Sequence, residues 1–596
     1  MMAKGKGKTG KSGQGKSLRG PKKSLPSRIP GWTILILFCA LFLTQTVLSV
    51  RQESATFDET DHLPAGYVYW RVGDYGVNPE HPPFVKMLAA FPLLFVRVTL
   101  PPLPTEIGEQ EWGFGRQLLY EANDADRLLF MGRMAVLPLA LLLGLAVFLW
   151  ARDLFGRGAA IFALFLYTFE PNILAHAPLV NTDLGAACFI FLAIYTFWRL
   201  VQRVSASRLL LASGSLALAL ITKFSSLQLL PLFLLLGFGV VVTRQGIEVD
   251  LKNSSPIRVA DRTRKLLILL ATMLVMGLMA YLTIWMVYRF RYAGIIVQGE
   301  RTQFPWNGIP GKPWMMQVFA LMRETKLLPE AYLFGMARVF TTFKRVAFLM
   351  GQISTDGWWY YFFVTFLLKT PLPFLLLLAV TPLALRRVWR ENRLAAFFLL
   401  VPVLVYFGIA SASRLNIGHR HLLPVYPFLI VMVSSLVPWV MKQRTPAKAG
   451  VVILAAWYLV SSVSIFPHYL AYFNELVGGP DNGYKYLVDS NLDWGQDLKG
   501  LKRYMDAHRI PRVWLSYFGT ASPEYYGITY NFLPSYIIFN GNDDEVLTPF
   551  TAISATNLMG VYFPDGLGLD ADFFKDFRGR RPVAKIGYSI FIYRRE

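Results

Sequence analysis

A cluster of acidic side chains and one histidine follows the first apolar run of the chain. The run covers residues 31–50, long enough to cross a bilayer, and the sequence FDETDH places Asp58, Glu59 and His62 shortly after it. A carboxylate beside an apolar, partly dehydrated interface can have a raised pKa and act as a general base. The alternative is an ordinary hydrated loop, in which neighbouring acids are common. The first interpretation predicts a reaction centre at the edge of a membrane.

Three more polar stretches stand at the ends of apolar runs. In VNTDLG, Asp183 begins a span, where a carboxylate is costly unless it is paired or faces a polar cavity. In ITKFSS, Lys223 ends a span, where it can snorkel to the interface or hold a phosphate. In SRLNIGHRHLLP, His419 and Arg420 lie between two spans. Alternation of the spans brings all three stretches to the same side as Asp58.

The combination of these residue types predicts a class of chemistry. Carboxylates suit the activation of a hydroxyl group, whereas Lys and Arg suit a phosphate leaving group. Together they predict group transfer from a lipid phosphate that reaches the site through the bilayer.

The composition predicts a polytopic helical membrane protein. Of the 596 residues, 54% are hydrophobic and 16% are charged, whereas soluble domains carry about 25% charged residues. Hydropathy predicts about eleven transmembrane helices. Their expected ranges are residues 31–50, 128–150, 158–173, 179–200, 209–222, 227–243, 266–288, 359–383, 394–412, 422–441 and 450–466.

The distribution of positive charge predicts the orientation. If the N-terminus is cytoplasmic, every loop on the inside contains Arg or Lys, as the positive-inside rule requires. The protein is then expected in an inner or plasma membrane with its C-terminus outside. The net charge of +22 owes much to residues 1–28, a Lys-rich and Arg-rich segment without acids that is predicted to be disordered. Because this segment stands beside a membrane span, we interpret it as a signal that retains the N-terminus in the cytoplasm. No nucleic-acid partner is expected.

The domain organisation follows from the loops. Residues 29–466 form the predicted transmembrane domain, with large outside segments near 51–127 and 289–358. Within the first, FVKMLAAFPLLFV is too short to span and predicts an interfacial or re-entrant helix. The alternating apolar runs RVWLSYFG, SYIIFN, LMGVYFP and YSIFIYRR predict a small extracytoplasmic α/β domain over residues 467–596.

Five motifs follow one another along the first part of the chain. They are Asp58-Glu59, His81-Pro82-Pro83, Arg133, the NTD of residues 181–183 and the TKFS of residues 222–225. Their order resembles bacterial membrane glycosyltransferases of the GT-C fold. The similarity runs through roughly the first 440 residues, and the nearest groups are the protein O-mannosyltransferases and the lipid A aminoarabinose transferases. The family's lysine-proline-proline motif reads His-Pro-Pro here, and Lys86 is the candidate for the missing cation.

The resemblance implies an inverting hexosyl or pentosyl transferase. It would move a sugar from a polyprenyl-phosphate carrier to an acceptor hydroxyl on a protein, lipid or glycan outside the membrane. Asp58 would deprotonate that hydroxyl, with Glu59 and Asp183 as further catalytic candidates. The candidates for binding the donor phosphate are Lys223, Arg133, Arg420 and Lys86. The candidates for substrate contact are His62, His81, Glu80, His419 and Trp494.

The scheme requires no metal or other cofactor. Oligosaccharyltransferases share the broad fold but use metal-binding acidic motifs, so Asp58, Glu59 and Asp183 leave a divalent cation open. The acids and amide at Asp489, Asn491, Asp493 and Asp497 match the first, third, fifth and ninth places of a calcium loop. Gly495 is one place late and no glutamate stands twelfth, which favours a polar turn whose acids cap the helix that follows.

Two other classes of function are compatible with the same features. A transporter or flippase of lipid-linked sugar would also carry intramembrane charges, although transporters often show two related halves and none is visible here. A noncatalytic glycan-binding scaffold would keep the same surfaces without needing the charge of Asp58. Large outside segments favour the enzyme.

Overall fold

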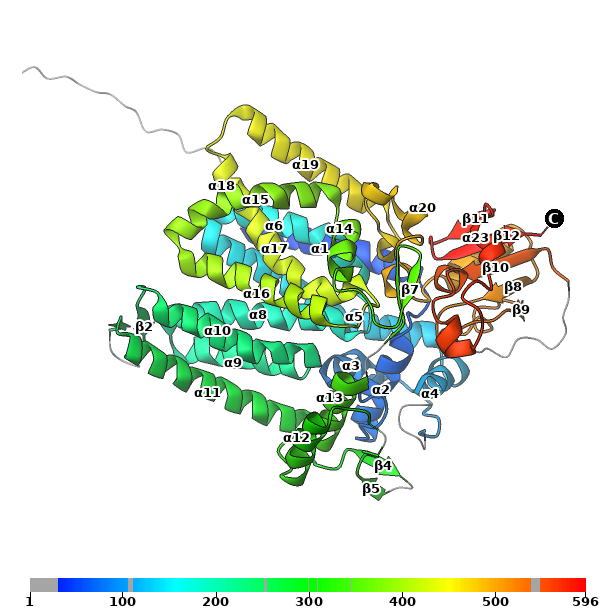
Figure 1. Ribbon diagram of the computed structural model, residues 1–596, viewed down its shortest axis with the longest axis horizontal. Helices are drawn as coiled ribbons and strands as arrows, with labels where there is room; N and C mark the ends of the chain where they lie inside the picture. Colours follow the sequence, from blue (N-terminus) through cyan, green and yellow to red (C-terminus); the bar gives the residue numbers. More distant parts are fainter. Residues whose placement is uncertain are drawn as a thin grey trace, which may run out of the picture.

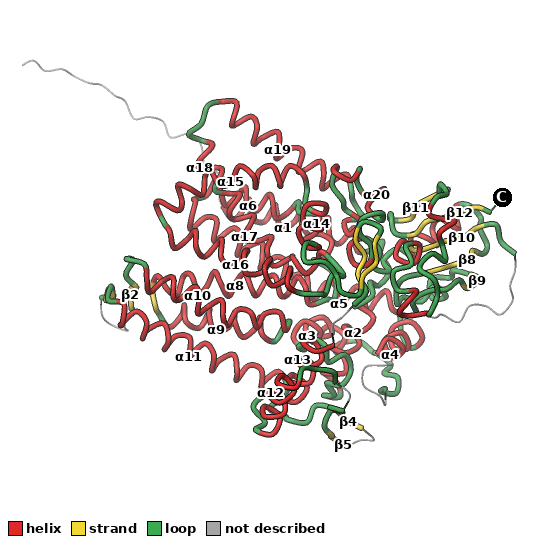
Figure 2. Tube along the Cα trace, in the orientation of Figure 1, coloured by secondary structure: helices red, strands yellow, loops and turns green. Residues whose placement is uncertain are grey.

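The computed structural model describes residues 31–104, 111–250, 255–297, 300–307, 309–342, 345–537 and 547–595. The expected basic segment of residues 1–28 lies outside this part of the chain. Figure 1 shows a bundle of long helices, with a small sheet domain packed against one end. Figure 2 shows that strands are confined to the two ends of this bundle.

The expected polytopic helical architecture is confirmed. Within the described residues, nine helical segments are long and apolar enough to cross a membrane. They are α1 (Gly31–Val50), α5 (Ala125–Phe155), α8 (Thr182–Gln202), η3 with α10 (Phe224–Val242), α11 (Arg262–Val287), α15 (Leu372–Glu391), α16 (Arg393–Ala412), the segment His419–Val440 and α19 (Thr445–Ser464). Two further predicted spans are the shorter apolar helices α6 (Arg157–Thr168) and α9 (Ala206–Leu220).

Two predicted spans are broken by proline. The range expected as one helix over 359–383 consists of α14 (Tyr361–Lys369) and α15, with an extended residue before Pro371. The last span but one begins as the 3₁₀ helix η4 (His419–Val425) and continues as α17 (Tyr426–Ser434) and α18 (Leu436–Val440). Proline lacks an N–H group and disfavours helical geometry in the residue before it. The second break places Arg420 in a 3₁₀ turn at the end of the bundle.

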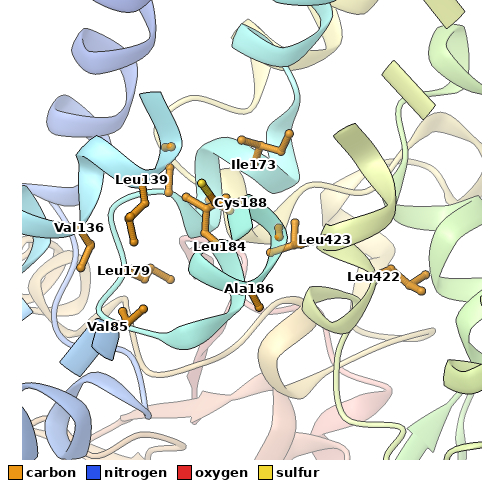
Figure 3. Close-up of a cluster of buried hydrophobic side chains, with 14 of the residues drawn as sticks. Val85, Val136, Leu139, Ile173, Leu179, Leu184, Ala186, Cys188, Leu422 and Leu423 are labelled. Atoms are coloured by element: carbon orange, nitrogen blue, oxygen red, sulfur yellow. The ribbon is translucent and has the colours of Figure 1, made fainter. Parts of the chain in front are cut away.

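The core of the bundle holds the elements that carry the predicted site. Helix α8 is apolar on nearly all sides. In its most apolar 18-residue stretch, 89% of the residues are buried, as expected for a helix surrounded by others. Figure 3 shows buried side chains of α8, such as Leu184 and Cys188, in one cluster with Val136 of α5 and Leu422 of η4. Val85 of α3 (Phe84–Ala90) belongs to the same cluster. These elements are therefore held in fixed relative positions.

The end of the bundle next to the sheet domain carries most of the short helices. Figure 1 places α2 (Glu59–Arg71), α3, α4 (Glu111–Arg116), α12 (Pro313–Glu324) and α13 (Glu330–Thr342) there. The predicted interfacial helix is observed as α3 followed by η1 (Phe91–Phe95). The opposite end has a small sheet of β1 (Arg203–Val204), β2 (Ile247–Val249) and β3 (Ile257–Val259).

The C-terminal part contains a five-stranded sheet, as expected of an α/β domain. Its order is β11-β12-β10-β8-β9, with β8 parallel to both β9 and β10 and β12 antiparallel to β10 and β11. RVWLSYFG and YSIFIYRR contribute β8 and β12. LMGVYFP forms no strand, since Gly560 has φ +68° and a proline follows, and SYIIFN lies partly outside the described residues. The strands are β8 (Val513–Ser516), β9 (Tyr530–Phe532), β10 (Phe550–Ser554), β11 (Ala584–Ile586) and β12 (Ile590–Arg594), and α21 (Leu498–Ala507) precedes them.

Candidate active site

A cavity of about 580 Å³ lies where the helix bundle meets the C-terminal domain. Its lining comes from the start of α2, from η3, α13 and η4, and from loops of the C-terminal domain. Seven of the residues predicted from the sequence to act on substrate line it, namely Asp58, His62, Glu80, His81, Lys223, Arg420 and Trp494. Segments that are hundreds of residues apart thus meet around one space.

A row of alternating charges forms one side of this cavity. Arg420 donates from Nη1 to Oδ2 of Asp58 at 2.6 Å and to Oδ2 of Asp183 at 3.0 Å. Lys223 donates to Oδ1 of Asp183. The guanidinium carbon of Arg420 also lies 4.4 Å from the centre of the Trp494 ring, within the range of a cation–π interaction. The structure therefore joins five predicted residues in one unit, with Asp183 buried behind the two cations.

Asp58 has an oxygen that is available for chemistry. It stands immediately before α2, and its side chain makes no capping hydrogen bond to that helix. Its side chain is 22% exposed, and Arg420 binds only Oδ2. Among the described residues Oδ1 has no hydrogen-bond partner. A carboxylate oxygen with free lone pairs facing a cavity can accept a proton from a bound hydroxyl.

Glu59 and Arg133 lie behind the cavity lining. Arg133 donates to both carboxylate oxygens of Glu59, at 2.8 and 2.6 Å, and also to the carbonyl of Ser54 at 2.8 Å. Glu59 accepts further bonds from the backbone N–H groups of Thr56 and Val180. Burial alone would raise the pKa of Glu59, but the charge and hydrogen bonds of Arg133 lower it below its ordinary value. The geometry gives this pair a positioning role instead of the catalytic and phosphate-binding roles expected from the sequence.

Lys86, like Arg133, holds backbone in place by hydrogen bonds. Its side chain is wholly buried, and Nζ donates to the carbonyl oxygens of Asn78 at 2.5 Å and His81 at 3.1 Å. It is absent from the residues that line the cavity. Lys86 therefore fixes the loop that carries Glu80 and His81, and it does not supply the phosphate-binding cation expected from the sequence.

His62 and His81 are neutral side chains of the cavity wall. Nδ1 of His62 lies 3.0 Å from the carbonyl oxygen of Val180, so Nδ1 carries the hydrogen and Nε2 is an acceptor. Burial lowers the pKa of His62 to about 4. Burial and the charge of Lys223 hold the pKa of His81 well below its usual range. These histidines are suited to hydrogen bonding with a substrate, and neither supplies a fixed positive charge.

His419 supports Arg420 from behind. It does not line the cavity, its backbone N–H donates to Oδ1 of Asn491 at 2.8 Å, and its Nε2 lies 2.6 Å from the hydroxyl of Tyr426. Lys369 donates to the carbonyl of Asn491 at 2.6 Å. The turn at Asn491 is therefore tied to η4, and His419 positions the turn of Arg420.

The calcium-loop-like residues point to different partners. Asp489 accepts from Tyr562, Asp493 accepts from the N–H of Thr556, and Asp497 accepts from Ser589 and Gln496. Asp497 stands at the N-cap of α21 but makes no side-chain cap, so the expected capping role is wrong. Oδ1 of Asn491 accepts from the backbone N–H of His419. In the described part of the chain, no group of three or more His, Cys, Asp or Glu residues is arranged to hold a metal ion.

The C-terminal domain braces the loop that carries Asp58. The backbone N–H of Ser54 donates to the carbonyl of Gln496 at 2.8 Å, and that of Phe57 donates to the carbonyl of Trp494 at 2.9 Å. The hydroxyl of Thr60 lies 2.7 Å from that of Thr520. Asp58 therefore lies between backbone and side-chain contacts to the C-terminal domain on both sides.

Several lining residues were not predicted from the sequence. They share no motif, and aromatic side chains from the first loop and the C-terminal domain predominate among them. Four of them, Phe57, Asp61, His421 and Asp489, lie inside stretches that the sequence singles out, but none was expected to contact substrate. No local signal distinguishes the others from surface aromatics or acids, and two of the acids stood only as metal candidates or motif neighbours. These residues include Phe57, Asp61, Trp112, Arg345, His421, Asp489, Phe518, Tyr536 and Tyr562.

Part of the chain matches a known protein family. Residues 128–257 match the family described as dolichyl-phosphate-mannose-protein mannosyltransferase. The matched segment covers less than half of the chain and contains Arg133, Asp183 and Lys223. The resemblance inferred from the motifs is confirmed over this segment.

Two solved structures align with most of the chain. ArnT from Cupriavidus metallidurans, solved with undecaprenyl phosphate bound, is 14% identical, with 94% of this chain and 97% of that chain covered and a TM-score of 0.43. The archaeal oligosaccharyltransferase AglB from Archaeoglobus fulgidus, solved with an inhibitory peptide and a dolichol-phosphate, is 12% identical, covering 73% of this chain and 55% of that one at a TM-score of 0.41. No curated protein matches the chain by sequence.

Proposed function

We propose that the chain is a membrane glycosyltransferase that moves a sugar from a polyprenyl-phosphate carrier to an acceptor hydroxyl. The observation that carries this proposal is the row Asp58–Arg420–Asp183–Lys223 at the wall of a cavity that adjoins an apolar helix bundle. The row combines a free carboxylate oxygen with two cations, as a reaction between a hydroxyl and a phosphate-linked sugar requires. The family match over residues 128–257 supports the same class of donor.

The geometry suits a single displacement at the sugar. Oδ1 of Asp58 accepts the proton of the acceptor hydroxyl while the hydroxyl oxygen forms a bond to the anomeric carbon. The bond between that carbon and the phosphate oxygen breaks, and its electron pair leaves with the polyprenyl phosphate. Attack opposite the leaving group inverts the anomeric centre, and the donor sugar is a hexose or a pentose.

Arg420 and Lys223 are the cations that stabilise the leaving phosphate. Both line the cavity, and Lys223 has three donors of which one binds Asp183. Arg420 uses Nη1 for both carboxylates, and among the described residues its Nη2 has no hydrogen-bond partner. Donors therefore remain for phosphate oxygens as negative charge develops on them. Arg420 and Lys223 already neutralise the charges of Asp58 and Asp183, so the proposed scheme uses no divalent cation. We therefore expect activity to persist in EDTA.

The site faces the extracytoplasmic side in this proposal. The connection between α10 and α11, which contains β2, lies at the end of the bundle opposite the C-terminal domain in Figure 1. That connection includes Arg244 and Arg258, α11 begins at Arg262, and basic loops remain in the cytoplasm under the positive-inside rule. We accordingly assign residues 29–466 to the membrane domain and residues 467–596 to an extracytoplasmic domain.

The deciding experiment measures the release of polyprenyl phosphate by the purified, reconstituted protein. A panel of polyprenyl-phosphate sugars is supplied with a cell-envelope extract as the source of acceptors. We expect turnover of at least one donor and a loss of 100-fold or more, on the order of a general base's contribution, in Asp58→Asn. The matched control is Asp481→Asn, which alters an exposed acid of the C-terminal domain. Donor binding without turnover, unchanged by Asp58→Asn, would instead identify a transporter or a binding scaffold.

A further inference from the structure

Five aromatic side chains form a continuous part of the cavity lining on the side of the C-terminal domain. Phe57 and Phe518 stack with ring centres 5.5 Å apart, and Phe518 and Tyr562 stack at 5.6 Å with ring planes 5° apart. Tyr536 lies 4.8 Å from Tyr562, and Trp112 packs edge-on against Phe57 at 5.1 Å. All five line the cavity, and we call them the aromatic wall. The mechanism proposed above uses none of them.

A fixed carboxylate adjoins the aromatic wall. Asp489 lines the cavity, and its Oδ2 accepts a hydrogen bond from the hydroxyl of Tyr562. Its Oδ1 accepts from the backbone N–H of Ser490, and its own N–H donates to Oγ1 of Thr556 at 3.1 Å. Its backbone is left-handed, at φ +56°, an uncommon conformation that costs energy and concentrates at functional sites. These contacts hold the carboxylate in one orientation, with lone pairs left for a ligand.

The part of the cavity lining that comes from the helix bundle differs from the aromatic wall. There the lining comes from α13, from η3 and from the end of α16, and includes the apolar side chains Leu227, Val339, Phe340 and Ile409. Phe340 is 50% exposed and Ile409 48% exposed, as expected for side chains in contact with lipid. We therefore expect the polyprenyl chain of the donor to bind along α13, η3 and the end of α16. The aromatic wall then remains for the acceptor.

We propose that the aromatic wall and Asp489 form the subsite for the acceptor, and that the acceptor is a saccharide. A pyranose has an apolar C–H face, which can pack on an aromatic ring, and hydroxyl groups at its edge, which can donate hydrogen bonds to a carboxylate. Phe57 immediately precedes Asp58, so a sugar on this wall has a hydroxyl within reach of the base. This inference rests on the proposed function and names the acceptor class.

The lining also disfavours a peptide as acceptor. Extended peptides are commonly bound by pairing with the edge of a sheet. None of the described residues that line the cavity belongs to a strand. The wall therefore offers rings and a carboxylate, without the backbone edge that an extended peptide would pair with.

The test measures saccharide binding directly, so that it does not depend on donor turnover. Saturation-transfer NMR follows a panel of 4-nitrophenyl hexopyranosides with the full-length protein in detergent, for the wild type, Asp489→Asn and Tyr562→Phe. We expect binding of at least one glycoside and a weakening of about tenfold in each variant, in line with the loss of a hydrogen bond to a charged group. Tyr504→Phe is the matched control, because Tyr504 stacks on His508 outside the cavity. Thermal unfolding checks that each variant is folded.

Each result has a separate consequence. Glycoside binding that is weakened in both cavity variants and kept in the control supports the subsite. No binding to the wild type, or equal binding by all variants, overturns it, as does a Ser/Thr peptide that accepts sugar when no glycoside does. A wild-type protein that binds glycosides through this wall but releases no polyprenyl phosphate refutes the proposed function and leaves the saccharide site standing.

Discussion

The pair of Glu59 and Arg133 shows how a residue beside a catalytic group can serve only to position it. Both side chains are buried and hydrogen-bonded to each other and to the backbone just before Asp58. From the sequence, both acids were catalytic candidates, with Asp58 as the expected base, and the residue types alone gave no reason to assign Glu59 a purely positioning role. The difference arises because Glu59 points to Arg133 of α5, whereas Asp58 points into the cavity.

This difference predicts opposite behaviour of two conservative variants. Glu59→Gln leaves Arg133 as an uncompensated buried charge, which costs about 3–5 kcal/mol of stability, and the thermal unfolding midpoint should fall by several degrees. Asp58→Asn should abolish turnover with little change in that midpoint, because Asp58 is partly exposed. The double variant Glu59→Gln with Arg133→Gln should recover part of the lost stability. Equal midpoints for Glu59→Gln and the wild type would contradict the positioning role.

Hydropathy predicts the helices of the bundle well and their interruptions poorly. Apolar residues lie on both sides of Lys369-Thr370-Pro371, and the apolar run that follows Arg420 contains Pro424 and Pro427. A window of about twenty residues averages over such a proline, although the local backbone must change there. The order and type of most elements were therefore predictable, whereas the 3₁₀ turn that aims Arg420 at Asp58 and Asp183 was not.

At the scale of elements, the packing of α13 against the loop at Pro79 gives a sharp prediction. A Cβ atom at Gly335 would lie 2.0 Å from the carbonyl oxygen of Pro79, a backbone atom that cannot move aside alone. Gly335→Ala should therefore displace the loop that carries Glu80 and His81, lowering both stability and turnover. Gly277→Ala on α11 is the control, since nothing lies within 4 Å of its Cβ. It should be neutral or more stable by up to about 1 kcal/mol, measured by thermal unfolding.

At the scale of the whole molecule, the cavity forms because the C-terminal domain packs against the loop that carries Asp58. The contacts of Ser54 with Gln496 and of Phe57 with Trp494 join segments separated by more than four hundred positions. Nothing in a local pattern reports such contacts, which is why the sequence predicted a C-terminal α/β fold but left its role in the site open. The charged residues near the membrane could be predicted because charges are costly there. The aromatic wall could not, because aromatic residues are common at membrane interfaces.

The same junction contains two acids, the partly buried Glu53 and the buried Asp493, that should make the fold less stable at alkaline pH. Burial raises the pKa of Glu53 to about 7, with Asp497 adding to the effect, and burial raises the pKa of Asp493 to about 8. In the unfolded chain these carboxyls ionise near pH 4. Between pH 4 and pH 8 the folded protein therefore holds protons that the unfolded chain has released, and stability falls as the pH rises.

The expected result is a lower unfolding midpoint at pH 8 than at pH 5. Over this range the loss is on the order of 2–3 kcal/mol for Glu53 and 3–4 kcal/mol for Asp493, at roughly 1.4 kcal/mol for each pH unit between pH 5 and the folded pKa. Glu53→Gln and Asp493→Asn should each make the midpoint less dependent on pH, because the amides do not titrate. Asp506→Asn, which alters an exposed acid paired with Lys502, should leave the pH dependence as it is. A midpoint that rises from pH 5 to pH 8 would mean that these acids are ionised at the junction, and that the C-terminal domain is held to the first loop by charge instead of by neutral hydrogen bonds.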